Sequence, residues 1–280
     1  MSKLIDKMIK KSDCTAYYCL HVMSSRRRNA LYAICAFAKC VMDIASSTEK
    51  TSRKIDLLNA WQQELDNIYQ NKAPISQIGQ DIFAVLQNFN LPQNEFMMLL
   101  NSIRNDLINP PCGLSEQVYG QYCDERAGVF IRQALRVMGC GDEVYINNLS
   151  NCLGKALQTT LFLRDIKEDA LSGRVYMPIN YLHEAGIKSN DPTEILINNN
   201  LSKARSNLSK IAETNFVKAF EILKHSDKKT AFSLKTLIYP YKYCFDVMNS
   251  RGWEVITPKP DISAFTKVML FIKAYMEKVF

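Results

Sequence analysis

Glycine and proline are scarce in this chain, whose 280 residues include 10 glycines and 9 prolines. Folds built from strands and turns use both residues often, whereas both residues interrupt helices. The scarcity therefore argues against a sheet protein and favours long helices. Length alone leaves one or two domains open, and a hydrophobic content of 47% is ample for a sizeable core.

Several motifs that would assign a function class are absent. None of the nine cysteines belongs to a CxxC pair, and an odd number without zinc-like spacing argues against a disulfide framework and for a reducing compartment. A dinucleotide fingerprint and nucleic-acid motifs are also missing, so we expect neither NADPH nor a nucleic-acid partner. The net charge of +7 is modest and suits a phosphate-bearing ligand or an anionic membrane surface.

The chain also lacks an apolar run long enough to span a bilayer, and its first residues lack the apolar core of a signal peptide. We therefore expect a cytoplasmic protein, with peripheral attachment to the inner membrane face as a further hypothesis. This hypothesis depends on the last expected helix, where Lys267, Lys273 and Lys278 lie towards the side opposite a broad apolar face. That face comprises Phe265, Val268, Met269, Phe271, Ile272, Tyr275 and Met276. The alternative is a helix that packs this face on the domain.

Apolar residues recur at helical spacing along most of the chain. The pattern predicts helices at 14–45, 53–70, 76–90, 93–108, 115–138, 143–171, 193–225, 228–250 and 262–279. Breaks occur at Pro110-Pro111-Cys112-Gly113 and at Gly139-Cys140-Gly141, and Asp191-Pro192 has the pattern of a cap followed by a first-turn proline. Strand alternation, repeats and low-complexity linkers are missing. We therefore expect a single all-α domain over residues 1–280.

The segment 153–178 carries the residue pattern that most strongly indicates a catalytic site. On a helix, Asp165 and Asp169 share one face, and two carboxylates one turn apart can bind Mg²⁺ that also holds a diphosphate. Arg164 and Arg174 flank them and could bind phosphate oxygens through paired hydrogen bonds. Gln158 lies about two turns upstream on a similar face. Taken by itself, the DxxxD spacing is weak evidence for such a site and is more typical of a solvated acidic face.

The whole segment resembles the second aspartate-rich signature of the squalene/phytoene synthase family. In this chain the signature consists of Leu153-Gly154, Ala156-Leu157-Gln158, Arg164-Asp165, Asp169 and Gly173-Arg174-Val175-Tyr176-Met177-Pro178. Three further segments resemble the family in the same order: RRNALYAICAF at 27–37, Tyr122-Cys123-Asp124 with Ala127-Gly128, and RGW at 251–253, the last as in bacterial presqualene diphosphate synthases. The resemblance covers about residues 15–260.

The resemblance implies an isoprenoid synthase-type helical bundle around a central cavity. It also implies a Mg²⁺-dependent prenyltransferase that joins two prenyl diphosphates head to head. Two farnesyl diphosphates, giving presqualene diphosphate or a squalene-type product, are the expected substrates.

The same resemblance implies roles for individual residues. Tyr122 is the candidate for proton abstraction, with Asp165 and Asp169 as the other catalytic residues. The expected metal ligands are Asp165, Asp169 and Asp43, and Asp43 and Asp165 should face each other across the cavity. The expected substrate-binding residues are Tyr17, Lys39, Gln158, Arg164 and Arg174.

The first aspartate motif departs from the family pattern. The outer aspartates of the expected DDxxD fall on Met42 and Ser46, while Asp43 remains, and Lys39 replaces an arginine. Methionine and serine are poor ligands for a hard cation, and lysine lacks the bidentate fork of arginine. Two pocket positions differ as well, with Ile131 for a glycine and Leu161 for an asparagine.

Two interpretations follow. In the first, the chain is a working prenyltransferase with an altered donor site. In the second, it keeps the fold and cavity but acts through a protein partner, as a binding or respiratory complex I assembly-type factor. The intact second motif favours the enzyme and the damaged first motif favours the assembly factor. On balance we favour the enzyme.

Overall fold

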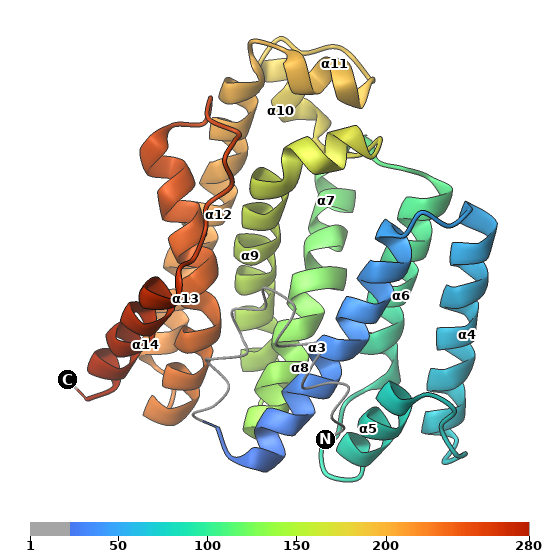
Figure 1. Ribbon diagram of the computed structural model, residues 1–280. Coiled ribbons are helices and arrows are strands. Elements are labelled where there is room, and N and C mark those ends of the chain that lie inside the picture. The colour runs from blue at the N-terminus through green and yellow to red at the C-terminus, as the bar shows by residue number, and fades with distance from the viewer. Residues whose placement is uncertain (1–22, 280) are drawn as a thin grey trace. The chain divides into compact units, whose positions relative to one another are not determined.

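The computed structural model describes residues 23–279, which form two compact units (Figure 1). Among these residues, the first unit comprises 23–109 and Val129–Ile146, and the second comprises Pro110–Gly128 and 147–279. Nearly all of the regular structure is helical, so the all-α prediction is confirmed. The single-domain expectation stays a prediction, and Tyr17 lies outside the described residues.

Within the described residues, the first unit contains five whole helices and the first turn of a sixth. The five whole helices are α3 (Ser25–Ser46), α4 (Thr51–Tyr69), α5 (Gln77–Leu86), α6 (Gln93–Ile108) and α8 (Val129–Met138). The core forms around Phe37 of α3, whose ring centroid lies 5.3 Å from those of Trp61 and Phe96, both edge-on. Edge-to-face packing of this kind stabilises a core beyond its buried area.

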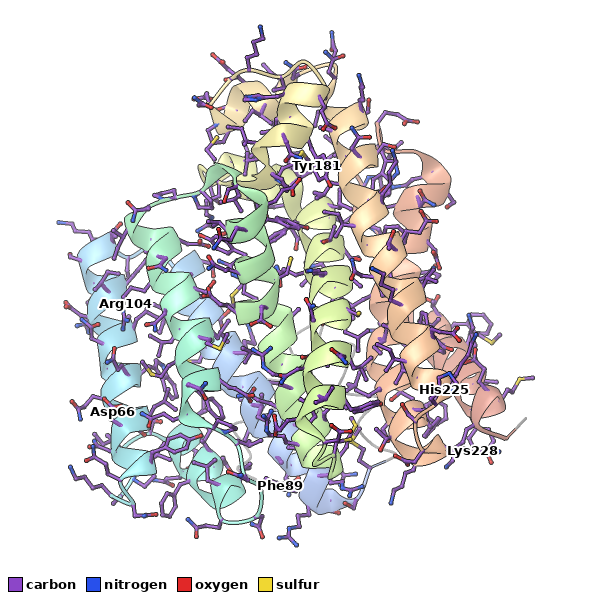
Figure 2. All side chains as sticks on the ribbon, turned by 180° about the vertical axis from the view of Figure 1, so that it is seen from behind. Asp66, Phe89, Arg104, Tyr181, His225 and Lys228 are labelled. Atoms are coloured by element: carbon purple, nitrogen blue, oxygen red, sulfur yellow. The ribbon has the colours of Figure 1, made fainter. Side chains whose placement is uncertain are left out.

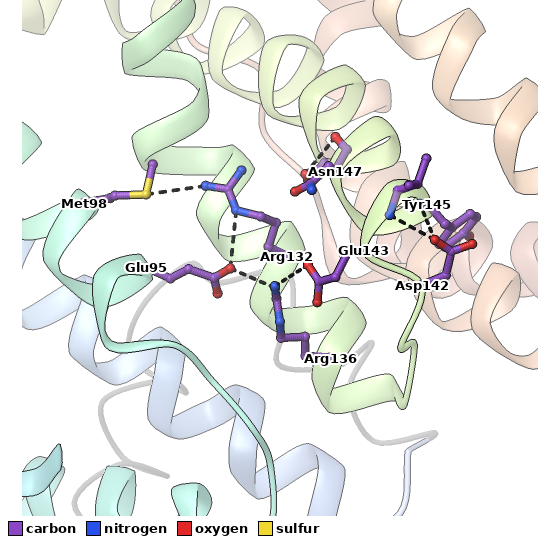
Figure 3. A network of polar contacts seen from close by, with 10 residues as sticks. Glu95, Met98, Arg132, Arg136, Asp142, Glu143, Tyr145 and Asn147 are labelled. Carbon is purple, nitrogen blue, oxygen red and sulfur yellow. Dashed lines mark hydrogen bonds and ion pairs between the residues drawn. The ribbon is translucent and has the colours of Figure 1, made fainter.

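A buried ionic network holds α6 on α8 within the first unit (Figure 3). Glu95 of α6 lies 2.8 Å from Arg136 Nη1 and 3.4 Å from Arg132 Nε, both on α8. Arg136 also contacts Glu143 at 2.8 Å. Because Glu95 is nearly inaccessible to solvent, its charge requires these partners.

Helix α3 is long and apolar enough, by length and composition, to cross a membrane. This differs from the expectation that the chain has no such run. Leu31, Phe37 and Val41 of α3 are buried in the structure, and α3 contacts α4, α5, α6 and α8 of its own unit. Core helices of globular proteins pass the same test, and the packing of α3 matches that case.

The second unit contains the remaining elements. They are β1 (Cys112–Leu114), α7 (Glu116–Cys123), the π-helix η2 (Asp124–Gly128), most of α9 (Glu143–Leu171), β2 (Val175–Pro178), α10 (Ile179–Glu184), α11 (Pro192–Ile197), α12 (Leu201–Lys224), α13 (Lys228–Arg251) and α14 (Ala264–Val279). The expectation of no strands was wrong: β1 and β2 pair in parallel. They are too short to show alternation, and all four residues of β2 are buried.

Two helix boundaries also differ from the sequence prediction. The helix expected at 115–138 is divided by η2, and the one expected at 193–225 is divided into α11 and α12. At the second break the Asn198 side chain accepts from the backbone N–H of Asn200 at 2.9 Å, which favours a turn over a continued helix. The predicted cap is confirmed, since Asp191 accepts from the N–H groups of Thr193 and Glu194 with Pro192 in the first turn.

The C-terminal helices α12, α13 and α14 lie together in the second unit (Figure 1). One face of α14 packs on α13, where Ala274 is buried with Phe232 and Tyr239. Glu277 of α14 is bonded to Lys235 at 2.7 Å and to the Tyr239 hydroxyl. The opposite face of α14 is exposed: Phe265, Val268, Met269, Ile272, Tyr275 and Met276 each keep between 42% and 72% of their surface accessible.

Candidate active site

The second aspartate-rich segment lies on α9, as predicted, and ends with it. Gly173, at φ +77°, occupies the left-handed region that favours glycine. The N–H of Arg174 then donates to the Asp169 carbonyl at 2.9 Å, and that of Gly173 to Ala170 at 2.9 Å. This pair of bonds closes the helix in a Schellman arrangement. Asp165 and Asp169 therefore lie one turn apart in the last turns of α9.

Asp165 is bound by two cationic side chains. Arg164 donates from Nε to Oδ1 at 2.9 Å and from Nη2 to Oδ2 at 2.7 Å. Lys259 donates to Oδ1 at 2.6 Å and reaches Glu168 Oε2 at 2.9 Å. Burial alone would raise the pKa of Asp165, but the bonds and charges of Arg164 and then Lys259 outweigh it and lower the pKa. Asp165 is thus held as a carboxylate.

The pairing of Asp165 with Arg164 and Lys259 determines whether the segment can bind a divalent cation in this arrangement. Both oxygens of Asp165 already accept from cationic donors. Within residues 23–279, no group of three or more His, Cys, Asp or Glu side chains is arranged to hold a metal ion. The residues in this arrangement do not form a Mg²⁺ site, and the metal roles of Asp165, Asp169 and Asp43 stay predictions.

The loop between α13 and α14, residues 252–263, brings Lys259 to Asp165; we call it the strap. Arg205 of α12, with 1% of its surface exposed, donates to the carbonyls of Trp253 and Val255 and, at 3.2 Å, of Leu163 on α9. Its guanidinium also lies 5.5 Å from the Trp253 ring centroid. Burial, with the charge of Arg251 adding to it, lowers the pKa of Arg205 to about 10. Arg205 therefore anchors the strap to α9 at Leu163, two residues before Asp165.

Tyr122 belongs to an aromatic cluster in the second unit. Its ring centroid lies 5.5 Å from that of Tyr176 on β2, which stacks on Phe162 of α9 at 4.4 Å. The Arg126 guanidinium of η2 lies 4.8 Å from the Tyr122 ring and 4.9 Å from the Tyr176 ring. The YC…AG segment and the second signature are thus brought together, which the sequence resemblance implied without showing how.

A close backbone approach fixes this arrangement. A Cβ on Gly154 would lie 2.9 Å from Gly128 Cα and 3.0 Å from the carbonyl oxygen of Cys123. Only a glycine at this position lets α9 approach η2 so closely. The Leu-Gly and Ala-Gly pairs of the two signatures are therefore packing partners.

Two predicted substrate-binding residues lie on or beside α9. Gln158 is buried. Arg174 is half-buried, and its Nε is buried without a hydrogen-bond partner in the part of the chain that the structure describes. Such an N–H donor is costly to bury unless a ligand or another partner satisfies it.

In the first aspartate motif, on α3, the polar side chains bond to groups of their own helix. Lys39 donates to both carboxylate oxygens of Asp43 at 2.9 Å. The Ser46 hydroxyl bonds to carbonyls of its own helix, and the Met42 side chain is exposed. Asp43 belongs to the first unit and Asp165 to the second, so their facing each other across a cavity stays a prediction.

Sequence reasoning missed three residues of this site: Lys259, Arg205 and Arg126. Lys259 and Arg205 act through partners far away in the sequence, and Arg126 has one such partner in Tyr176. Helical spacing along one segment cannot reveal such distant pairs. The RGW at 251–253 was the available signal for the strap. It indicated where the loop begins but not the role of the residues after it.

Known proteins are similar to this chain in sequence and in fold. The profile of squalene/phytoene synthase matches residues 9–266. Presqualene diphosphate synthase of Sinorhizobium fredii is 29% identical over 261 residues, covering 93% of this chain and 92% of the relative. That of Zymomonas mobilis is 29% identical over 241 residues, covering 85% and 81%.

Solved structures show the same fold. A dehydrosqualene synthase in complex with ligand superposes with a TM-score of 0.86 at 20% identity, covering 99% of this chain and 96% of that one. The squalene synthase HpnC of Alicyclobacillus acidocaldarius gives 0.77 at 19% identity, covering 90% and 94%. With the profile matched over most of the chain and both signatures joined in one unit, the chain belongs to the squalene/phytoene synthase family.

Proposed function

We propose that the chain condenses two prenyl diphosphates head to head, with farnesyl diphosphate as substrate and presqualene diphosphate or a squalene-type compound as product. The observation that carries the proposal is that α9, which bears the bonded pair Arg164 and Asp165, also packs through Phe162 on the cluster of Tyr122, Tyr176 and Arg126 in the second unit. The relatives named for presqualene diphosphate support the substrate class.

The proposed reaction breaks the C1–O bond of one prenyl diphosphate, and the electron pair leaves with the diphosphate. The double bond of the second molecule attacks the allylic cation, and loss of a proton closes a cyclopropane. Arg174, whose buried Nε is unpaired among the described residues, would donate to a phosphate oxygen. The buried rings of Phe162 and Tyr176 would keep water from the cation. Tyr122 would accept the proton.

The competing function is that of a binding or respiratory complex I assembly-type factor. The observation that favours it is the state of α3, where Asp43 is paired with Lys39 and the flanking positions are Met42 and Ser46. A chain of this kind would bind a prenyl compound or a protein partner without turnover.

Incubation of the full chain with farnesyl diphosphate and Mg²⁺, followed by solvent extraction and mass spectrometry, tests the proposal. We expect a C30 product that is reduced at least a hundredfold by Asp165→Asn. Asp246→Asn, which alters an exposed Lys–Asp pair on α13, is the matched control and should keep full activity. Folded protein that yields no C30 product at any Mg²⁺ concentration would favour the assembly-type function.

We also propose that the protein attaches peripherally to an anionic membrane through the exposed face of α14. Six large apolar side chains of one helix face are 42–72% exposed, and a patch of this kind marks an interaction site. Lys273 of α14 is exposed, and exposed Lys228 and Lys229 begin the helix on which α14 packs. Figure 2 shows Lys228 and His225 where α12 gives way to α13. Anionic lipid would complement these cations.

Co-sedimentation with phosphatidylglycerol vesicles tests the attachment. We expect binding at low salt that weakens with salt and that Met269→Glu with Ile272→Glu abolishes. Val217→Glu, at an exposed apolar position of α12, is the control and should bind normally. Absence of binding at low salt would end the idea, and self-association lost in the double variant would show that a second copy covers this face.

A further inference from the structure

Each of the two aspartate motifs contains an aspartate that already has a lysine as partner. Lys39 binds both oxygens of Asp43 within α3. Lys259 binds Asp165 at 2.6 Å and Glu168 at 2.9 Å in the second unit. The first pair is a local i, i+4 contact, whereas the second joins residues 94 positions apart. A contact over that separation needs the fold to place the lysine.

The strap is held by bonds that lead to this position. Arg205 bonds to the carbonyls of Trp253 and Val255 at its start, and Arg251 donates to the carbonyl of Pro258, next to Lys259. Because Arg205 also bonds to Leu163, the strap and the aspartate helix share one buried anchor. The position of Lys259 is therefore set by the strap and does not depend on chance surface pairing.

We propose that Lys259 is an internal counter-ion that competes with divalent cations for Asp165 and Glu168 and so sets the metal affinity of the second aspartate motif. The Lys259 side chain is 35% exposed and that of Asp165 is 26% exposed, so the pair is partly shielded from water.

The competition follows from charge and ligand type. Asp165, Glu168 and Asp169 project three carboxyl groups from one turn of α9, and Mg²⁺ and Mn²⁺ prefer such oxygen ligands. With Lys259 in place, Asp165 and Glu168 are partly neutralised and a cation must displace the lysine. Without Lys259, the three acidic groups would attract a divalent cation directly. The role of Lys259 in setting metal affinity rests on the proposed function, in which the diphosphate binds here. The ion pair itself is independent of that proposal.

Titration of Mn²⁺ alone, with free Mn²⁺ measured by electron paramagnetic resonance, tests the proposal on the full chain without substrate. We expect Lys259→Met to bind Mn²⁺ at least tenfold more tightly than the unmodified chain. Lys259→Arg keeps the charge and should not gain affinity. Lys242→Met removes a lysine from another Lys–Asp pair of the same unit and is the matched control, expected to bind as the unmodified chain does.

The site of the gain is checked by Lys259→Met combined with Asp165→Asn, which should lose it. Equal Mn²⁺ affinity in the unmodified chain and Lys259→Met would overturn the proposal, as would a gain that persists without the Asp165 carboxylate. Circular dichroism melting of each variant confirms that it is folded, and Lys259→Gln serves if Lys259→Met does not fold. Because Mn²⁺ alone is measured, absence of a C30 product would refute the proposed function without affecting this result.

Discussion

Replacing Gly154 with alanine should disturb the contact that joins the two signatures. The added Cβ would meet Gly128 Cα at 2.9 Å, Gly128 N at 3.0 Å and the Cys123 carbonyl oxygen at 3.0 Å. All three atoms belong to the backbone, so no side-chain rotation can make room. Either α9 or η2 must shift.

The magnitude follows from two opposing effects. Forcing extra atoms into a packed contact costs about 1–3 kcal/mol, and the rigid backbone neighbours place this case in the upper half of that range. Alanine in a helix interior is about 1 kcal/mol more favourable than glycine. The net loss in the free energy of unfolding should be about 1–2 kcal/mol, which lowers the melting temperature by about 2–4 °C per kcal/mol.

Gly120→Ala is the matched control. Gly120 lies on α7, and nothing lies within 4 Å of its added Cβ, so the same substitution should stabilise the chain by about 0.5–1 kcal/mol. Urea unfolding of both variants measures the difference. A Gly154→Ala variant as stable as Gly120→Ala would refute the argument that this close backbone approach holds α9 against η2.

Three further outcomes are expected. If the first motif limits turnover, a variant in which that motif and the two pocket positions are restored should form more C30 product, since two added carboxylates complete the metal ligands. A folded variant that binds Mg²⁺ without turnover would count against the synthase function. That variant combines Met42→Asp, Ser46→Asp, Leu161→Asn and Ile131→Gly. Glu95→Ala should cost about 3 kcal/mol in urea unfolding because it removes the buried carboxylate that pairs with Arg132 and Arg136. Glu143→Ala, at an exposed partner, should cost less than about 1 kcal/mol. Burial opposes the charge of Glu277, but Lys235 and Tyr239 outweigh it and lower its pKa from 4.5. The stability that Glu277 contributes is therefore present above pH 4.5 and lost as the pH falls below it. Glu277→Gln and the unmodified chain should differ in urea midpoint at pH 7 and differ less and less as the pH falls below 4.5, and a difference that does not shrink would contradict this.

The helical fold was predictable because its signals are local. Apolar spacing and the scarcity of breakers placed α6 at 93–108 and α9 at 143–171 as the structure has them. The break at Asn198 was missed because an asparagine turn within a polar stretch does not interrupt the apolar pattern. The strands were missed because burial on all sides removes alternation from β2.

The site was predictable only where its functional residues belong to one continuous segment of the sequence. Asp165, Asp169 and Arg164 follow from one helix, so the sequence placed them together. The bond from Lys259 to Asp165 depends on Arg205, which lies in neither segment. No spacing rule connects three such positions, and only the fold brings them into contact.

The chain path between the two units has a consequence for dissecting the protein. Residues 110–128 of the second unit interrupt the first, and 129–146 of the first interrupt the second. The polypeptide thus crosses between the units three times, at 109/110, 128/129 and 146/147. No single cut gives either unit whole: a fragment ending at 109 lacks α8, and one beginning at 147 lacks Tyr122 and its π-helix. Expression of either half alone should therefore give an incomplete core.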